Sequence, residues 1–250
     1  MYNRFFFHNF ATSYYQKDTL YICKTMKRYI FLLIFITCWV TMQAQKKLSV
    51  LGDSYSTFKG YVQPDTNLVW YPEGKGNDVA LYEETWIPKL LKITDLILEK
   101  NNSYSGSTIC NTGYSKQDYS DRSFITRVDN LGNPDVILVF GGTNDDWAKS
   151  PLGEFKYKNF SKLDLYSFRP ALAFLCAKLK KSYPKAKVFF VLNTDLKPDI
   201  NASFETILKH YKMPLVKLHD IDKTHSHPSK TGMTAIATQI AEVILGFVHR

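Results

Sequence analysis

Continuous apolar runs alternate along the chain with segments that have helical periodicity. Val136–Phe140 and Val188–Leu192 consist entirely of apolar residues, which is typical of parallel strands buried on both faces. Shorter runs predict further strands at Leu48–Leu51, Leu96–Lys100 and Leu215–Leu218. We expect Val136–Phe140 to lie at the centre of the resulting sheet.

Apolar residues at helical spacing fill the intervals between these strands. Helices are predicted around Trp86–Leu91, through Leu172–Leu179 and over Ile200–Tyr211, and a last helix carries an apolar face from Ile236 to Phe247. Ser229 is a candidate N-cap for that last helix. The alternation predicts a three-layer α/β/α fold with a doubly wound, five-stranded parallel sheet of the flavodoxin-like kind. In such a fold, ligands bind beyond the carboxyl ends of the strands.

A different pattern precedes the first strand. The basic pair Lys27 and Arg28 is followed by the apolar run Tyr29–Val40, and small or polar residues continue to Ala44. This charged, apolar, cleavable order is typical of a secretory signal peptide. The run is shorter than the roughly 20 residues of a membrane-spanning helix, so an anchor is the weaker alternative.

We therefore divide the chain into residues 1–44, an upstream extension with a signal peptide, and residues 45–250, one globular domain. Met26, directly before the basic pair, is the expected true start. The mature protein is then secreted or periplasmic, without stable insertion in a membrane. A lipid-modified Cys38 is an alternative that the preceding residues match poorly, because they are not the small residues such sites usually have.

Composition narrows the class of protein. The chain has 250 residues, 45% of them hydrophobic, which suits a single domain with its own core. The net charge is +9, but the basic residues are scattered and form no stripe with interleaved aromatics, so nothing points to nucleic acid. Cys110 and Cys176 could pair after export, or each could be a small buried residue.

Three polar motifs each follow a predicted strand. Gly52-Asp53-Ser54 comes directly after the first strand, where backbone N–H groups at the start of a helix can hold a developing oxyanion. Asn102–Ser107 contains a glycine whose N–H could approach a ligand oxygen. Gly141–Asp145 follows the central strand and offers the side-chain amide of Asn144 as a hydrogen-bond donor.

A fourth motif, Asp220–Pro228, lies in the loop before the last helix and supplies imidazole and carboxylate groups together. A serine is a weak nucleophile unless a base takes its proton, and a carboxylate usually orients that base. Binding of a metal by the His-Ser-His spacing is an alternative, but no third ligand stands at a familiar distance, so we predict neither a metal nor a cofactor.

These four motifs together resemble those of the SGNH hydrolase superfamily, the GDSL-type esterases and lipases. The resemblance spans about residues 47–247. It implies Ser54 as the nucleophile, with its own N–H, Gly106 and Asn144 forming the oxyanion hole, and His227 as the general base. The absence of a G-x-S-x-G elbow counts against the α/β-hydrolase alternative.

One position departs from the family pattern. The family usually has an aspartate three residues before the catalytic histidine, whereas Thr224 stands there in this chain. Asp222 lies three residues before His225, which leaves a second candidate base. We assign the base to His227 and, as an orienting acid, Asp222, while Asp220 or the absence of an acid stays open.

Aromatic residues are frequent in the motif loops and could stack on sugar rings or cover acyl chains. The resemblance therefore implies a secreted serine esterase that deacetylates carbohydrate, acting on a small-molecule or glycan ester. Two alternatives remain: a lipid esterase or lysophospholipase, and an inactive carbohydrate-binding protein of the same fold. The oligomeric state is not predicted. The candidate substrate-binding residues are Tyr55, Trp70, Tyr71 and Trp147, with Tyr104 near them.

Overall fold

The computed structural model describes residues 24–29 and 45–248. Residues 24–29 form a short helix within a unit, Met1–Ala44, that is separate from the unit formed by Gln45–Arg250. Nearly all of the predicted signal peptide, including the expected cleavage position near Ala44, lies outside the described residues. Among those that are described, no helix is both long and apolar enough to cross a membrane.

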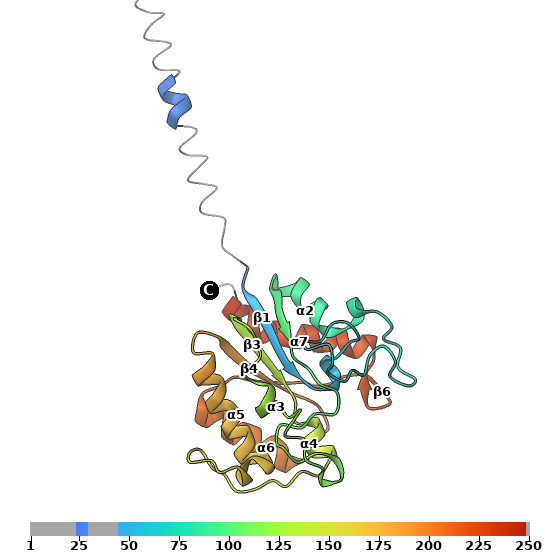
Figure 1. The fold of residues 1–250 in the computed structure, drawn as a ribbon. Coiled ribbons are helices and arrows are strands. Elements are labelled where there is room, and N and C mark those ends of the chain that lie inside the picture. The colour runs from blue at the N-terminus through green and yellow to red at the C-terminus, as the bar shows by residue number, and fades with distance from the viewer. Residues whose placement is uncertain (1–23, 30–44, 249–250) are drawn as a thin grey trace, which may run out of the picture. The chain divides into compact units, whose positions relative to one another are not determined.

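A five-stranded parallel sheet forms the middle layer of the second unit (Figure 1). The strand order is β2-β1-β3-β4-β5, so β3 is central as predicted. This order confirms the doubly wound, flavodoxin-like topology. The strands are β1 (Lys47–Gly52), β2 (Ile97–Asn101), β3 (Val136–Phe140), β4 (Lys187–Leu192) and β5 (Leu215–Lys217).

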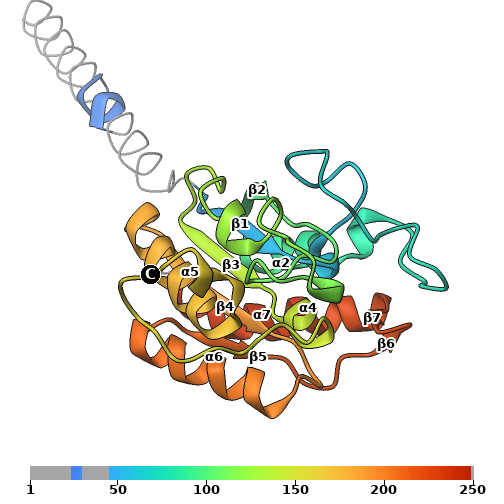
Figure 2. The same cartoon turned by 60° about the horizontal axis from the view of Figure 1, so that its bottom comes forward.

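Helices cover both faces of the sheet and complete the three layers (Figures 1 and 2). On one face, α2 and α7 pack together over β1, β3 and β4, and on the other α3, α5 and α6 share a second hydrophobic core. A short helix, α4, begins where β3 ends. The helices are α2 (Trp86–Thr94), α3 (Phe124–Arg127), α4 (Thr143–Trp147), α5 (Phe168–Ser182), α6 (Pro198–Tyr211) and α7 (Lys230–Val248).

The central strand shows why a continuous apolar run is needed. Ile137 and Val139 belong to the core beneath α5 and α6, while Leu138 and Phe140 belong to the core beneath α2 and α7. Successive side chains of a strand point to opposite faces, so a strand covered on both sides must be apolar at every position. All five side chains of β3 are buried.

Two local predictions also hold. The hydroxyl of Ser229 accepts a hydrogen bond from the backbone N–H of Gly232 at 3.2 Å, which is the contact of an N-cap. Cys110 and Cys176 are both buried free thiols, so the sequence alternative in which they pair is not realised.

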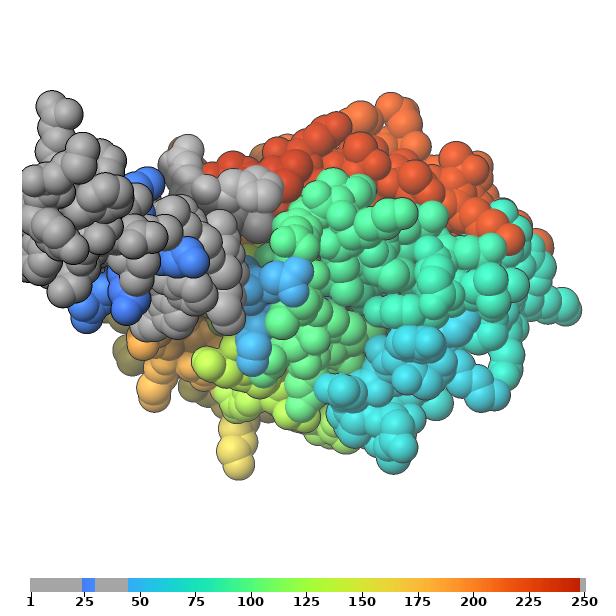
Figure 3. Space-filling model, turned by 90° about the horizontal axis from the view of Figure 1, so that it is seen from above, coloured from blue at the N-terminus to red at the C-terminus, as the bar shows by residue number. Residues whose placement is uncertain are grey.

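A long connection between β1 and α2 carries most of the aromatic residues that the sequence placed near the site. Its start is tied to its later part by a bridge between Phe58 and Tyr71 and by a 2.9 Å hydrogen bond from Lys59 N–H to the carbonyl of Tyr71. Figure 3 shows this connection, in cyan to teal, as a lobe beside α2. The sequence predicted no regular structure here, and apart from the short turn Tyr82–Glu84 little is present.

A second, two-stranded sheet had no counterpart in the sequence pattern. Lys223–Thr224 (β6) pairs antiparallel with His227–Pro228 (β7), forming a hairpin directly before α7. Its loop consists of His225 and Ser226, which both have positive φ, at 50° and 64°. Two consecutive residues of this kind form the turn whose twist suits a tight hairpin, although Asn-Gly is the usual choice. His225 and Ser226 therefore hold backbone strain that the surrounding contacts must offset.

Candidate active site

Ser54 begins a single 3₁₀ turn immediately after β1. The carboxylate of Asp53 accepts a hydrogen bond from the N–H of Tyr55 at 3.1 Å and so caps this turn. The serine is only 5% exposed. A sharp strand-to-turn junction thus places a hydroxyl at the carboxyl edge of the sheet, where the fold predicts a ligand site.

The hairpin before α7 brings His227 to the same place. Its Nε2 lies 2.9 Å from the Oγ of Ser54, although 173 positions separate the two residues. This is the distance of a hydrogen bond between a nucleophile and its base. The arrangement allows the imidazole to take the serine proton as the hydroxyl attacks a carbonyl.

The other ring nitrogen of His227 contacts a backbone carbonyl. Nδ1 lies 3.3 Å from the carbonyl oxygen of His225, whose position depends on the positive φ of the hairpin turn. A carbonyl can accept from Nδ1–H and so fix the tautomer in which Nε2 is the base. It does not supply the negative charge with which a carboxylate stabilises an imidazolium.

The structure does not bring Asp222 to the imidazole. Its Oδ2 instead accepts a hydrogen bond from the Oγ of Ser229, the N-cap of α7. Asp220 is also elsewhere, with its carboxylate 3.0 Å from Nδ1 of His219. The carbonyl of His225 occupies the position at Nδ1 that we assigned to the acid.

His225, the alternative base, lies on the outside of the hairpin. Its ring packs against Gly76, where an added Cβ would stand 2.5 Å from the His225 Cε1 atom. Within the described residues, no group of three His, Cys, Asp or Glu side chains could hold a metal ion.

Aromatic rings enclose the imidazole of His227. Trp70 stacks on it, with 3.7 Å between ring centroids and 8° between ring planes. Tyr55, Tyr71 and Trp147 approach at steeper angles, with centroids 5.1, 6.3 and 6.2 Å away. The imidazole therefore lies among aromatic rings and is largely shielded from solvent, since the residue is only 6% exposed.

This enclosure changes the acidity of His227. Burial disfavours the charged imidazolium and lowers the pKa of His227 to about 4, and the ammonium of Lys223 acts in the same direction. The hydrogen bond to the carbonyl of His225 opposes the change. The imidazole is consequently neutral at pH 7, as a general base must be.

Three of the predicted substrate-binding side chains contact the hairpin. The hydroxyl of Tyr55 donates to the carbonyl of Ser226, and that of Tyr71 donates to the carbonyl of Pro228 at 2.9 Å. Both rings are fully buried, and one face of Trp70 is covered by His227. Trp147 differs because 40% of it is exposed, which leaves it free to contact a substrate.

Asn144 is held in place at the start of α4. Its Oδ1 accepts a hydrogen bond from the Tyr114 hydroxyl at 2.7 Å, and its Nδ2 donates to the carbonyl of Ser107 at 3.1 Å. These contacts fix the orientation of the amide and leave its second N–H as a donor. The preceding Gly142 has φ 97°, and a side chain there would also meet Phe204 at 2.6 Å.

Gly106 completes the set that the sequence predicted. Its φ is 79°, and a Cβ there would have no atom within 4 Å, so this loop borders open space. Within the described part of the chain, the N–H groups of Ser54 and Gly106 have no hydrogen-bond acceptor. Together with the free N–H of Asn144, they can donate to a substrate oxygen.

Buried charges beneath the site connect its loops. Arg127 donates to the carbonyls of Gly52 at 3.2 Å and Asn102, and to the hydroxyl of Ser107 at 2.8 Å. The carboxylate of Asp145 accepts from the N–H groups of Ile109 and Cys110 at 2.7 and 3.1 Å. These contacts set the loop after β2 against the ends of β1 and β3.

Burial also raises the pKa of both nearby carboxylates. Desolvation brings the pKa of Asp53 to about 7 and that of Asp145 to about 6, despite hydrogen bonds that act in the opposite direction. The same burial lowers the pKa of the Arg127 guanidinium to about 9.

Sequence reasoning missed Tyr114, Arg127 and the carbonyl of His225. Tyr114 and Arg127 stand outside the four motifs, and no local pattern signals that either reaches a motif loop. The positive φ of His225 likewise has no signal, because histidine is not a typical residue for such a turn.

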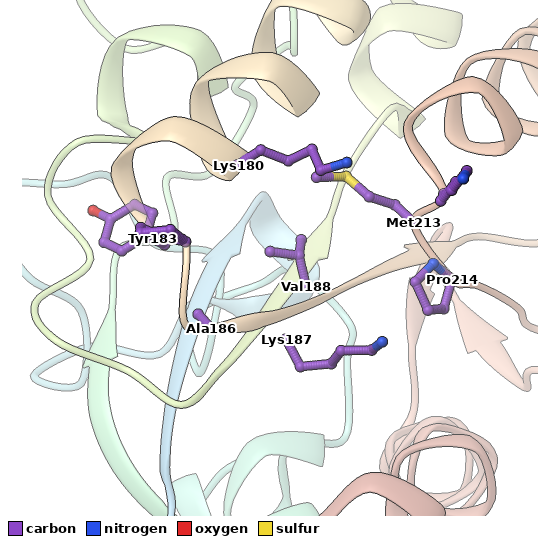
Figure 4. Close-up of a pocket in the computed structure, with 9 residues that line it drawn as sticks. Lys180, Tyr183, Ala186, Lys187, Val188, Met213 and Pro214 are labelled. Carbon is purple, nitrogen blue, oxygen red and sulfur yellow. The ribbon is translucent and has the colours of Figure 1, made fainter.

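A concavity of about 230 Å³ lies at the opposite edge of the sheet from Ser54 (Figure 4). It is formed by the end of α5, the start of β4 and the segment before β5. Two of its lysines already have partners: Lys180 Nζ donates to the carbonyl of Tyr211 at 3.0 Å, and Lys187 Nζ lies 4.5 Å from the ring centroid of Phe247. This concavity is separate from the Ser54 site.

Comparisons with known proteins agree with this architecture. A family model described as GDSL-like lipase/acylhydrolase matches residues 46–244. The solved structure of a GDSL-like lipase from Bacteroides uniformis is 52% identical, with a TM-score of 0.81 over 82% of this chain and 98% of that chain. A GDSL-like lipase from Bacteroides ovatus is 51% identical, with a TM-score of 0.79, and the match covers 81% of this chain and 99% of that chain. A comparison with curated proteins finds no match.

A more distant structure shares the fold. It is an acetyl xylan esterase from the rumen bacterium Butyrivibrio proteoclasticus, 15% identical with a TM-score of 0.54, and the match covers 82% of this chain and 64% of that chain. The three-layer fold, together with the family match, defines an ester-hydrolysing enzyme of the SGNH hydrolase superfamily. The chain belongs to the GDSL-like lipase/acylhydrolase family.

The lowered pKa of His227 predicts a base that tolerates acid. Only the neutral imidazole can accept the serine proton, so the loss of kcat/KM that belongs to His227 should come as the pH approaches about 4, below any change that protonation of Asp53 and Asp145 causes between pH 7 and 5. A pH profile of p-nitrophenyl acetate hydrolysis, with circular dichroism at each pH to check folding, measures this. Lys223→Met should move the decline to higher pH. A titration midpoint of the His227 ring near the ordinary histidine value, followed by NMR, would contradict the prediction.

Proposed function

We propose that this enzyme is a secreted serine esterase that removes acetyl groups from carbohydrate, with Ser54 as nucleophile and His227 as general base. The observation that carries the proposal is the 2.9 Å hydrogen bond between Ser54 Oγ and His227 Nε2 at the carboxyl edge of the sheet. Export is supported by the pattern of Lys27, Arg28 and the apolar run Tyr29–Val40.

The geometry supports a two-stage acyl transfer. Ser54 Oγ attacks the ester carbonyl while its proton passes to His227 Nε2, and the carbonyl oxygen takes up the negative charge. The N–H groups of Ser54 and Gly106 and the amide of Asn144 are proposed to stabilise that charge. The imidazolium then returns its proton to the departing alcohol, and water releases the acid from the acyl-enzyme in the same way.

Asp222 has an indirect part in this proposal. By accepting from the Ser229 hydroxyl, it supports the N-cap of α7, and α7 begins directly after the hairpin that carries His227. Its substitution should therefore affect the position of the hairpin more than the charge of the imidazole.

Carbohydrate is favoured by the exposed indole of Trp147. Its ring centroid lies 6.2 Å from that of His227, close enough for a sugar whose ester reaches Ser54. Flat aromatic faces suit stacking on sugar rings. Tyr55, Trp70 and Tyr71 are left out of this proposed surface because their contacts are with the hairpin.

Substitution of the nucleophile gives the most direct test. Ser54→Ala should abolish p-nitrophenyl acetate hydrolysis and labelling by a fluorophosphonate probe, because both need the hydroxyl. Thermal melting of the variant should stay close to that of the original protein. Ser105→Ala, which alters a serine of the neighbouring loop that is not proposed to react, serves as the labelling control. Labelling that persists in Ser54→Ala would disprove the assignment.

The two histidines can be separated by substitution. His227→Ala should lower kcat/KM by roughly 10³-fold or more, since the serine loses its proton acceptor. His225→Asn removes the other imidazole but keeps the backbone carbonyl, and asparagine tolerates positive φ. We expect it to change kcat/KM less than tenfold. An inactive His225→Asn beside an active His227→Ala would reverse the assignment.

Substrate class is tested by comparing esters of matched reactivity. Initial rates on acetylated xylo-oligosaccharides should exceed those on long-chain acyl esters and on lysophospholipid. Trp147→Ala should raise KM for the oligosaccharide and leave p-nitrophenyl acetate hydrolysis nearly unchanged, because the small ester does not need a stacking surface. Faster turnover of lysophospholipid would point to a lipid esterase instead.

A further inference from the structure

The imidazole of His227 lacks the partner that usually stabilises its charged form. When Ser54 attacks an ester, the imidazole gains a proton and becomes a cation inside an apolar enclosure. Among the residues that the structure describes, its Nδ1 has the carbonyl of His225 as its hydrogen-bond partner, at 3.3 Å. A buried cation without a partner is unfavourable, so the proton transfer would have a higher barrier. Another group must therefore lower the free energy of the imidazolium.

Trp70 is placed to do this. Its indole lies parallel to the imidazole within 8°, with 3.7 Å between centroids, so the negative face of the indole covers the ring that becomes positive. Tryptophan has the most favourable face of the aromatic side chains for a cation. The stacking also fixes the plane of the imidazole, and therefore the direction in which Nε2 points.

The backbone of Trp70 is joined to the nucleophile's own turn. Its N–H donates to the Thr57 hydroxyl at 2.9 Å, and that hydroxyl donates to the carbonyl of Ser54, also at 2.9 Å. On its far edge, the indole meets Gly74, where an added Cβ would stand 2.2 Å from Nε1. The indole is thus held between the serine turn and the lobe, independently of any substrate.

We propose that Trp70 is a positioning residue that takes over part of the role of the missing carboxylate, by holding the His227 ring and stabilising its cation. The proposal rests on the proposed function of Ser54 and His227. In the step concerned, the proton leaves Ser54 Oγ for His227 Nε2 as the bond from Oγ to the acyl carbon forms. The imidazolium later gives that proton to the leaving alkoxide, so Trp70 itself exchanges no atom.

Fluorinated tryptophans introduced only at position 70 test the proposal. Each added fluorine weakens the negative face of the indole while barely changing its shape. We expect log kcat for p-nitrophenyl acetate to fall stepwise with fluorine number, by roughly tenfold over the series, with KM nearly constant. The same series at Trp86, a buried indole that donates to the carbonyl of Tyr55 at 3.0 Å, should leave kcat unchanged.

Conventional variants provide a second series. Trp70→Phe keeps a weaker aromatic face and should retain more kcat than Trp70→Leu, which keeps only apolar cover. If Trp70 were instead a surface for substrate, both variants would raise KM. Trp70→Phe would then retain no more kcat than Trp70→Leu. A kcat that does not respond to fluorination, or a rise in KM alone, would overturn the proposal.

An NMR titration of the His227 ring separates this proposal from the catalytic assignment. Fluorination at Trp70 should shift the titration midpoint of His227 to lower pH, because the cation loses stabilisation while its burial is unchanged. The other groups that face the imidazole are the same throughout the series: the Lys223 ammonium, the Ser54 hydroxyl, the carbonyl of His225, and the rings of Tyr55, Tyr71 and Trp147.

The titration and the Ser54→Ala result answer different questions. If Ser54→Ala stays active, the proposed function fails, but the titration of His227 still reports whether Trp70 stabilises the imidazolium. If Ser54→Ala is inactive while neither the midpoint nor kcat follows fluorination, only the inference on Trp70 fails.

Discussion

The hydrogen bond between Ser54 and His227 requires two distant segments to meet within an ångström or so of the right geometry. The fold provides one of them rigidly, because Ser54 follows a strand that is paired on both sides. The other is a two-residue hairpin turn that would be strained in isolation. Side chains from the β1–α2 segment hold it by its carbonyls: Tyr55 donates to Ser226, and Tyr71 and Asn77 donate to Pro228. The stability of that lobe is thus a condition for the catalytic geometry.

The polar groups beneath the site form a second condition. Arg127 joins the end of β1 to the loop after β2 through carbonyl groups, so its contacts fix the relative position of Ser54 and Gly106 without touching either. Leaving such buried carbonyls without a donor would cost about 1–3 kcal/mol each. The second oxygen of Asp53 has no hydrogen-bond partner among the described residues. Burial of the charged Asp53 carboxylate raises its pKa and is therefore unfavourable for folding. The neighbouring Arg127 guanidinium offsets this unfavourable free energy only in part.

The fold was predictable from the sequence because its signals are local. A strand such as β3 must be apolar at every position, and the bounds predicted for it are those observed. Ser54, Asn144 and His227 could also be proposed from the sequence, since each occupies a motif at a predicted strand end or helix entrance. The docking of the hairpin on the β1–α2 connection and the stacking of Trp70 on His227 were not, because they arise from contacts between residues about 150 positions apart. Asp222 was misplaced for a related reason: spacing shows that a carboxylate is near in sequence, but the turn determines which way it points.

The aromatic enclosure of His227 has two opposing effects on catalysis. Exclusion of water lowers the pKa of the imidazole, which keeps it neutral but makes it a weaker base. A carboxylate at Nδ1 would restore basicity, yet in this site it would be a second charge without water around it, with its own cost of desolvation. A neutral carbonyl at Nδ1 avoids that cost and still selects the tautomer. Stabilisation of the transient cation must then come from a group that carries no net charge and needs no water, and an indole face is such a group. In the mechanism that we propose, the departure at Thr224 and the stacking of Trp70 belong together: the backbone orients the imidazole, and an aromatic ring stabilises its charge.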